Sequence, residues 1–332
     1  YLMRVLGLVA STYRLSAGRC PAYLQEIAEP DESPWELVRL ACRPDRPTAM
    51  AYIQRITSSW TELHGDRFHG DDPATICGLA ELGGQTVIII GQERGVDEAD
   101  RARRNGGRPR PEGFRKIQRA IELAAKLHFP VVSLIDTPGA DPGLASEENG
   151  LARSIATTIA AMSDLPVPIV SVIIGEGGSG GALALGVSDR VLMLEHAIYS
   201  VIAPEGAAAI IYRDASRAEE VSRALKLTAH DCKYLGVVDV IVPEPEGAAH
   251  AAPDEAARLL KNALLYELAT IQNRAPRKLV AERYRKFRKM GRFDTLPGWD
   301  ISRLLQRLPL PVRSERAGPV SYPRSGTEPS GG

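Results

Sequence analysis

The sequence predicts an α/β fold in which buried strands alternate with helices. Three uninterrupted apolar runs, at 86–90, 131–136 and 167–174, lack the polar alternation of half-exposed strands and are typical of strands covered on both faces. Between them, 111–128 and 146–164 carry apolar residues at helical spacing. The chain has 332 residues, 44% of them hydrophobic, which is enough for a substantial core.

The N-terminal residues, 1–45, predict a helical arm. A short apolar helix is expected first, followed by a loop and then by a second helix over 33–42, "SPWELVRLAC". Ser33 suits the N-cap of this second helix, and Pro34 suits its first turn. The apolar spacing of 46–65 predicts a further helix.

The C-terminal half continues the alternation and then becomes helical. "RVLMLEHAIYSVI" at 190–202 predicts two short strands joined by a bend, 218–236 a helix, and "VVDVIVPE" at 237–244 a last strand. Residues 253–291 read as purely helical and increasingly basic. We therefore divide the chain into the arm (1–45), a core (46–250), C-terminal helices (251–291) and a Gly-, Pro- and Ser-rich tail (292–332) that we expect to be partly disordered.

Composition excludes several classes of protein. Lys plus Arg and Asp plus Glu each number 41, so the formal net charge is zero and nucleic-acid binding is not indicated. None of the four cysteines forms a C-x-x-C pair, and no two histidines are spaced i, i+4, so we expect no metal in this chain. No apolar run is long enough to span a membrane, and reduced thiols without a signal peptide favour a cytoplasmic protein.

The segment "GEGGSGGALALG" at 175–186 is the most unusual in the chain. It matches G-x-G-x-x-G after a strand, with Glu195 at the distance of a ribose-binding acid, but the segment that follows is short and apolar on all sides, unlike a dinucleotide-binding helix. No Gly-Lys-Ser/Thr follows, which excludes a P-loop. Two uses of the glycines stay open: close packing of helices, or a helix N-terminus whose bare N–H groups form an oxyanion hole.

Six ordered motifs narrow these alternatives, because together they strongly resemble the carboxyltransferase alpha subunits of bacterial multisubunit acetyl-CoA carboxylases. The resemblance runs from about residue 36 to about residue 291 and rests on these segments: 62–75, 103–116, 135–143, 175–186, 199–206 and 237–250. It implies a crotonase-like fold, a superhelical core of strand-strand-helix units.

The resemblance also implies an activity and a set of partners. The activity is carboxyl transfer from carboxybiotin, carried on biotin carboxyl carrier protein, to acetyl-CoA, giving malonyl-CoA for fatty acid synthesis. The partners are biotin carboxylase and a zinc-ribbon beta subunit in an α2β2 assembly, with the zinc in the beta subunit. A biotin-dependent decarboxylase or another acyl-CoA carboxylase is the nearest alternative activity, and a non-catalytic scaffold subunit is an alternative of a different class.

Site residues follow from the match of motifs. The resemblance assigns the N–H groups of Gly180 and Gly181 to an oxyanion hole for the biotin carbonyl. Gly177 and Gly178 would shape the approach, and Ser179 could cap the helix. Pro138, Gly139 and Ala140 would form the active-site wall, although a simple strand-ending turn explains them equally well.

The stretch 101–119 is the most basic of the chain, with eight Arg or Lys residues. We predict Arg104 and Arg115 as substrate-binding residues for CoA phosphates or an acidic carrier face, against the plainer alternative of a solvated loop. Glu112 and Glu205 each follow a proline and suit the first turn of a helix.

Two features depart from the resembled family. Arg94 stands where the family usually has a lysine, within the altered segment 91–102. The first residue is Tyr1 and the arm is short, which would suit the alpha half of a fused beta–alpha chain or a trimmed chain.

Overall fold

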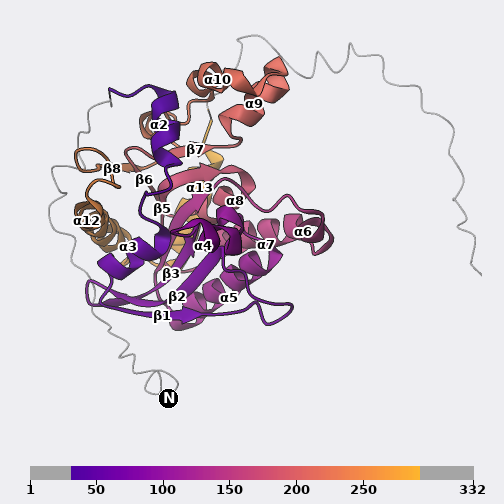
Figure 1. Ribbon diagram of the computed structural model, residues 1–332. Coiled ribbons are helices and arrows are strands. Elements are labelled where there is room, and N and C mark those ends of the chain that lie inside the picture. Colours follow the sequence, from indigo (N-terminus) through magenta and orange to yellow (C-terminus); the bar gives the residue numbers. More distant parts are fainter. Residues whose placement is uncertain (1–30, 292–332) are drawn as a thin grey trace, which may run out of the picture. The chain divides into compact units, whose positions relative to one another are not determined.

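The computed structural model describes residues 31–291, whose strands form one mixed eight-stranded sheet (Figure 1). The strands are β1 (Ser59–Leu63), β2 (Thr75–Leu82), β3 (Gln85–Gln92), β4 (Val131–Thr137), β5 (Ile169–Gly178), β6 (Arg190–Leu194), β7 (Ile198–Ser200) and β8 (Val240–Val242). Their order is β1-β2-β3-β4-β5-β6-β8, and β7 pairs with the end of β5. The first three strands are antiparallel, and every pairing from β3 onward is parallel.

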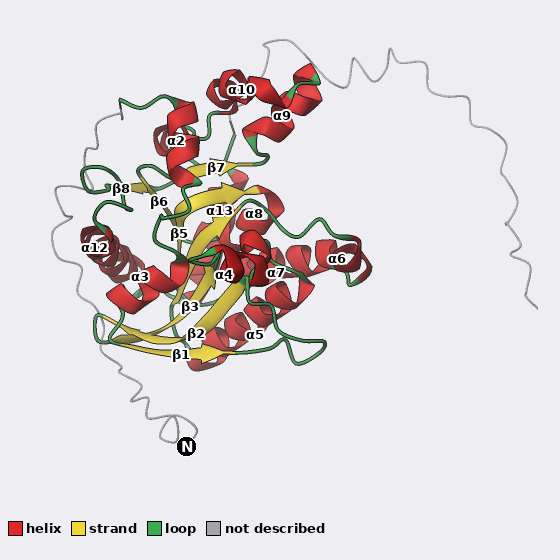
Figure 2. Ribbon diagram, in the orientation of Figure 1, coloured by secondary structure: helices red, strands yellow, loops and turns green. Residues whose placement is uncertain are grey.

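Helices cover both faces of this sheet, as Figure 2 shows. α3 (Ala49–Ile56) and α12 (Pro253–Ile271) pack on one face, and α5 (Pro111–Leu127), α7 (Leu151–Asp164) and α8 (Ser179–Gly186) pack on the other. The remaining helices are α2 (Pro34–Ala41), α4 (Glu98–Arg103), α6 (Leu144–Glu148), α9 (Pro204–Tyr212), α10 (Ala218–Leu225), α11 (Ala229–Tyr234) and α13 (Pro276–Arg288). This double cover explains why the central strands are continuously apolar.

The predicted α/β class is confirmed, and β2, β3 and α5 form a strand-strand-helix unit. The predicted strands at 86–90, 131–136, 167–174, 190–202 and 237–244 correspond to β3, β4, β5, the β6–β7 pair and β8. Each of the helices predicted at 146–164 and 218–236 is interrupted, at Gly150 and Lys226, where the backbone adopts positive φ.

The prediction of a helix over 46–65 is wrong in its second half. α3 ends at Ile56, and Ser59–Leu63 form the edge strand β1, paired with β2. β2 itself was not predicted, although Gly83 and Gly84, both at positive φ, join it to β3 in a two-residue hairpin. Pairing with a partner strand overrides the local helical spacing of this segment.

The described part of the arm agrees with expectation. Ser33 caps α2, accepting a hydrogen bond from Glu36 N while the Glu36 carboxylate accepts one from Ser33 N. The apolar helix predicted at the start of the arm and the tail 292–332 lie outside the described residues. The C-terminal helices contribute Leu260, Leu264 and Leu279 to the main hydrophobic core, so they pack as part of the core.

Arg283 fastens α13 to this core. Its guanidinium, fully buried, donates to both oxygens of Asp189 (3.0 and 2.8 Å). It also donates to four backbone carbonyls, those of Met162, Ser163, Leu165 and Val167. A buried charge is tolerated only when it is paired and hydrogen-bonded. Here the Arg283 side chain also provides hydrogen-bond donors for the carbonyl groups between the end of α7 and β5.

We therefore expect Arg283→Met to lower the free energy of unfolding by about 3 kcal/mol or more, because Asp189 and the four carbonyls lose their donor. The control is Arg285→Met on the exposed part of the same helix, where the side chain donates only to Ala281 O. Urea unfolding of both variants measures the difference. Equal losses would contradict this role.

Candidate functional site

The glycine-rich segment forms the junction between β5 and α8. Its first four residues, Gly175–Gly178, complete β5, and the helix begins at Ser179. Gly180 and Gly181 therefore belong to the first turn, where backbone N–H groups have no acceptor within the helix. The dipole of α8 adds partial positive charge at the same end.

Two glycines of this segment are required by close contact between backbones. A Cβ atom at Gly181 would lie 2.8 Å from Ala140 N and from Gly139 C, and one at Gly178 would overlap the carbonyl of Pro138. Behind them, the Tyr199 ring lies against Gly177. The segment 138–140 thus forms a wall directly against the start of α8.

Gly180 differs from Gly178 and Gly181 because a side chain there would make only ordinary van der Waals contacts. The nearest atoms to a Cβ placed there are Ile155 methyl groups at 3.9 Å. Gly180 lines a mostly apolar pocket of about 290 Å³ together with Ser179, Leu183, Tyr199, Ser200, Val201, Lys226, Cys232, Leu235 and Val237. The pocket opens onto the first-turn N–H groups of α8.

Ser179 does not cap α8, so that expectation is wrong. The N-cap position belongs to Gly178, and no side chain provides the capping hydrogen bond. Ser179 itself has φ +54°, in the left-handed region that residues with a Cβ rarely adopt. Such local backbone strain is characteristic of functional junctions.

The titratable side chains beside Gly180 are poorly suited to acid–base or nucleophilic chemistry at neutral pH. Burial raises the pKa of Tyr199 to about 12 and, with Asp231 nearby, the pKa of Cys232 to about 12. Lys226 is paired with Asp231 at 3.3 Å. The backbone N–H groups are therefore the groups at this pocket best placed to stabilise negative charge.

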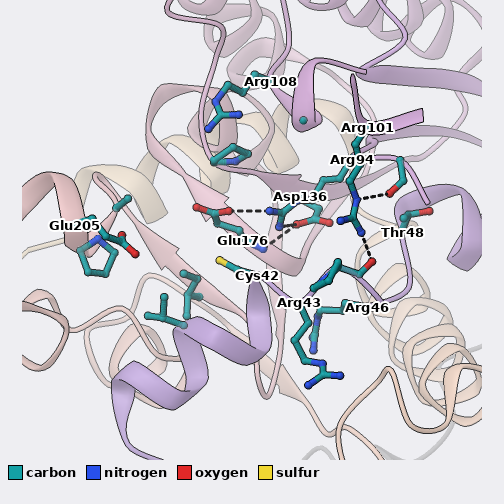
Figure 3. A pocket seen from close by; sticks show the side chains of 18 residues that line it. Cys42, Arg43, Arg46, Thr48, Arg94, Arg101, Arg108, Asp136, Glu176 and Glu205 are labelled. Atoms are coloured by element: carbon teal, nitrogen blue, oxygen red, sulfur yellow. Dashed lines mark hydrogen bonds and ion pairs between the residues drawn. The ribbon is translucent and has the colours of Figure 1, made fainter. Parts of the chain in front are cut away.

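A second, polar cavity of about 420 Å³ lies at the carboxyl ends of the parallel strands (Figure 3). In it, Arg94 Nη1 contacts Asp136 Oδ1 at 3.1 Å and Arg94 Nη2 contacts Glu176 Oε2 at 3.3 Å. Asp136 also accepts the Glu176 N–H at 2.9 Å. Arg94 thus joins the ends of β3, β4 and β5, just before the wall and the glycine junction.

Burial dominates the electrostatics of this cluster. It raises the pKa of Glu176, which the guanidinium of Arg94 only partly offsets, and it raises the pKa of Cys42 to about 12 with help from the Glu176 charge. Asp136 and Glu176 together raise the pKa of Arg94 against the effect of its burial. The Cys42 thiol therefore stays protonated at neutral pH.

The two arginines predicted to bind substrate are engaged within the chain. Arg104 donates to Asp100 (2.9 Å) and to Pro73 O (2.6 Å). Arg115 pairs with Asp66 (2.7 Å) and Glu112 (3.0 Å). Neither lines the pocket at Gly180 or the polar cavity, and their substrate-binding role stays a prediction.

Sequence inspection missed two residues that support the site. Gln92, fully buried at the end of β3, donates through Nε2 to Gly181 O at 2.8 Å and so holds the first turn of α8. Arg94 was noted only as a departure from a lysine. Its partners, Asp136 and Glu176, lie in the recognised motifs 135–143 and 175–186, but no local sequence pattern indicates that Arg94 contacts them. Glu112 and Glu205 lie in the first turns of α5 and α9, as predicted.

Below the cavity, Glu244 gathers a buried network. It accepts hydrogen bonds from Arg46 Nη1 (3.0 Å), His196 N (3.1 Å) and Ala249 N (2.7 Å), and pairs closely with Arg46 Nη2. Burial alone would raise its pKa, but the Arg46 charge and the side-chain hydrogen bonds of His196 and Arg46 outweigh burial and hold the pKa at about 2. The network anchors the segment before α3 to the end of β8.

Because the pKa of Glu244 is lowered from 4.5 to about 2 on folding, its contribution to stability is present above about pH 4.5 and is lost as the pH falls toward 2. We expect Glu244→Gln to lower stability at pH 7 and to flatten the acid limb of the stability profile. Urea unfolding between pH 7 and pH 3 measures this. An acid limb as steep as that of the unsubstituted chain would contradict it.

The different surroundings of Gly178 and Gly180 predict different effects of substitution on stability. Gly178→Ala should lower the melting temperature by several degrees, since its methyl group overlaps the Pro138 carbonyl. Gly180→Ala should leave the melting temperature within about 2 °C of the unsubstituted chain, because its methyl group would meet only Ile155, at an ordinary contact distance of 3.9 Å. Differential scanning calorimetry of the two variants measures their melting temperatures. Equal shifts in the two variants would contradict this prediction.

Within residues 31–291, no cluster of three or more His, Cys, Asp or Glu side chains could hold a metal ion. In the same range no helix combines the length and apolar character needed to cross a membrane.

Solved structures share this fold. One is transcarboxylase 12S with methylmalonyl-coenzyme A bound (TM-score 0.57, 20% identity, 75% of this chain and 47% of that chain). Another is a Pseudomonas malonate decarboxylase hetero-tetramer in complex with coenzyme A (TM-score 0.57, 18% identity, 77% and 97%). The fold is therefore the crotonase-like fold of carboxyltransferases and related decarboxylases.

Sequence comparison is more specific. Residues 23–291 match the family described as acetyl co-enzyme A carboxylase carboxyltransferase-like. The alpha subunit of the acetyl-coenzyme A carboxylase carboxyl transferase of Thermus thermophilus is 50% identical over 79% of this chain and 84% of its own length, and that of Geobacter sulfurreducens is 47% identical over 81% and 85%. In Salinispora tropica a chain named subunits beta/alpha is 50% identical over 80% of this chain and 47% of its own length. The chain belongs to the carboxyltransferase alpha-subunit family of acetyl-CoA carboxylase.

Proposed function

We propose that this chain supplies one half of an active site that transfers a carboxyl group from carboxybiotin to acetyl-CoA, forming malonyl-CoA. The observation that carries the proposal is the first turn of α8, where the Gly180 and Gly181 N–H groups lack helical acceptors and Gly180 lines an open pocket. The family assignment supplies the reaction class.

The chemistry suits backbone donors. When the carboxyl group leaves biotin, negative charge develops on the ureido oxygen, and the N–H groups of Gly180 and Gly181 would bind that oxygen. Donors fixed by the fold need no reorganisation as the charge develops, and loss of one such donor typically costs about 3 kcal/mol of barrier. Gly177 and Gly178 let the backbone pack closely, while Pro138, Gly139 and Ala140 hold the first turn from the other side.

None of the titratable side chains around the pocket is suited to act as the catalytic base. Tyr199 and Cys232 remain protonated at neutral pH, and Lys226 is ion-paired. A base for the methyl proton of acetyl-CoA would therefore have to come from the biotin nitrogen or from a partner chain, which is consistent with a site completed by a second subunit.

A partner is also suggested by the apolar surface around Gly180. Leu183 and Leu235 are partly exposed there and Val201 is 78% exposed, with Ile210 and Ile211 exposed on the adjoining helix α9. Exposed apolar surface of this kind marks a protein interface. We infer that a zinc-ribbon beta subunit covers it in an α2β2 assembly, and that biotin carboxyl carrier protein and biotin carboxylase deliver the carboxyl group. The proposed reaction is cytoplasmic, which agrees with the free thiols of Cys42, Cys77 and Cys232.

The test is decarboxylation of malonyl-CoA dependent on free biocytin, which runs the transfer in reverse without biotin carboxylase. Activity is expected when this chain is mixed with a beta subunit and not with either chain alone. Gly180→Val should lower kcat by about 100-fold, because the side chain blocks access to an oxyanion donor. The control is Gly70→Val, at a glycine where a side chain likewise meets no close contact and which lies outside the pocket.

Each other outcome points to a named alternative. An inactive mixture that forms a stable complex would favour another acyl-CoA substrate. Activity that appears only when a membrane partner is added would favour the decarboxylase. Full activity of Gly180→Val in a folded complex would support the scaffold role and overturn the proposed site.

A further inference from the structure

Arg108 stands apart among the eight basic residues of 101–119. Seven of them donate to, or pair with, groups within the described part of the chain. Those seven are Arg101, Arg103, Arg104, Arg110, Arg115, Lys116 and Arg119. Among residues 31–291, the Arg108 guanidinium has no hydrogen bond or ion pair, and Figure 3 shows it at the polar cavity without a dashed contact.

Arg101 is a second arginine of the same cavity that has no ion pair. Its guanidinium donates only to backbone carbonyls, those of Gly95 and Pro44, and has no carboxylate partner among the described residues. The other cavity arginines have carboxylate partners: Arg43 pairs with Asp45, Arg46 with Glu244, and Arg94 with both Asp136 and Glu176.

The cavity also carries acidic side chains. Glu205 lines it without a hydrogen bond or ion pair among the described residues, and Figure 3 shows this carboxylate on the opposite side of the cavity from Arg101.

The loop that carries Arg108 is tied to the catalytic wall. Asp141 N donates to Pro109 O at 3.0 Å, so the residue after Arg108 is hydrogen-bonded to the segment that packs against Gly181. Pro138, the first residue of the wall, also lines the cavity. The cavity and the proposed oxyanion hole thus share one wall.

We propose that Arg101 and Arg108 bind the anionic oxygens of a co-substrate, a phosphate or a carboxylate, in this cavity. The inference rests on the proposed function. A guanidinium presents a planar fork of donors that matches either group. The Arg108 fork is available without breaking an existing hydrogen bond, and Arg101 has no carboxylate partner to give up. The anion comes either from the phosphates of the CoA thioester or from the carboxyl group that is transferred.

The experiment compares Arg108→Gln and Arg101→Gln with the unsubstituted chain in the biocytin-dependent decarboxylation of malonyl-CoA, with the beta subunit present. The matched control is Arg103→Gln, which removes an equal charge from α4 outside the cavity. Arg108→Lys keeps the charge without the fork and should recover part of the loss. Melting temperatures confirm that the variants are folded.

The two sources of the anion give different results. If the phosphates of CoA bind here, KM for malonyl-CoA should rise about tenfold at unchanged kcat, the usual effect of losing one charge-assisted hydrogen bond. If the transferred carboxylate binds here, kcat should fall about tenfold at unchanged KM. In both cases the gap between variant and unsubstituted chain should narrow at high salt.

Unchanged KM and kcat in both Arg101→Gln and Arg108→Gln, with the unsubstituted mixture active, would overturn this inference and leave the proposed function standing. Equal losses in Arg103→Gln would overturn it as well, because they would show a general charge effect. An inactive unsubstituted mixture would instead contradict the proposed function, on which the inference depends.

Discussion

The contact between two backbones, the first turn of α8 and the segment 138–140, is the constraint on which the site depends. It requires that no Cβ atom stand at Gly178 or Gly181. It also requires that β4 and β5 end in the correct register, and the pairing of these strands shifts between Ile135 and Thr137, at the position of Asp136. Asp136 accepts hydrogen bonds from Glu176 N and Arg94, so the irregularity is held by side-chain bonds at the point where the wall begins.

At several places in this fold, a buried arginine links elements that are distant in the sequence. Arg94 joins three strand ends, Arg46 joins the segment before α3 to Glu244 after β8, and Arg283 joins α13 to the loop before β5. Each guanidinium has enough donors to satisfy several groups that would otherwise be buried without a partner. Because these arginines are fully paired, the unpaired guanidinium of Arg108 is the more distinctive feature of the cavity.

The arrangement explains how catalysis can proceed with few reactive side chains. A short helix presents bare N–H groups, an irregular strand end presents a wall, and the nearby Tyr199 and Cys232 stay protonated because they are buried. In the proposed function the chain contributes position and electrostatic stabilisation, and the proton acceptor and the second reactant come from biotin or from a second chain. The exposed apolar residues beside Gly180 are consistent with this division between two chains.

The sequence by itself determined the class of fold, because the apolar runs of β3, β4 and β5 and the helical spacing of α5 and α7 are local patterns. It also determined the Ser33 cap and the family motifs, including the glycines of the candidate oxyanion hole. Only the tertiary structure decided that 59–63 is a strand, that Gly178 rather than Ser179 occupies the N-cap of α8, and that Arg108 rather than Arg104 or Arg115 is unpaired. These outcomes depend on partners such as Glu81, Pro138 and Asp66, which are distant in the sequence or belong to another element, and a local pattern carries no information about which of them a side chain will meet.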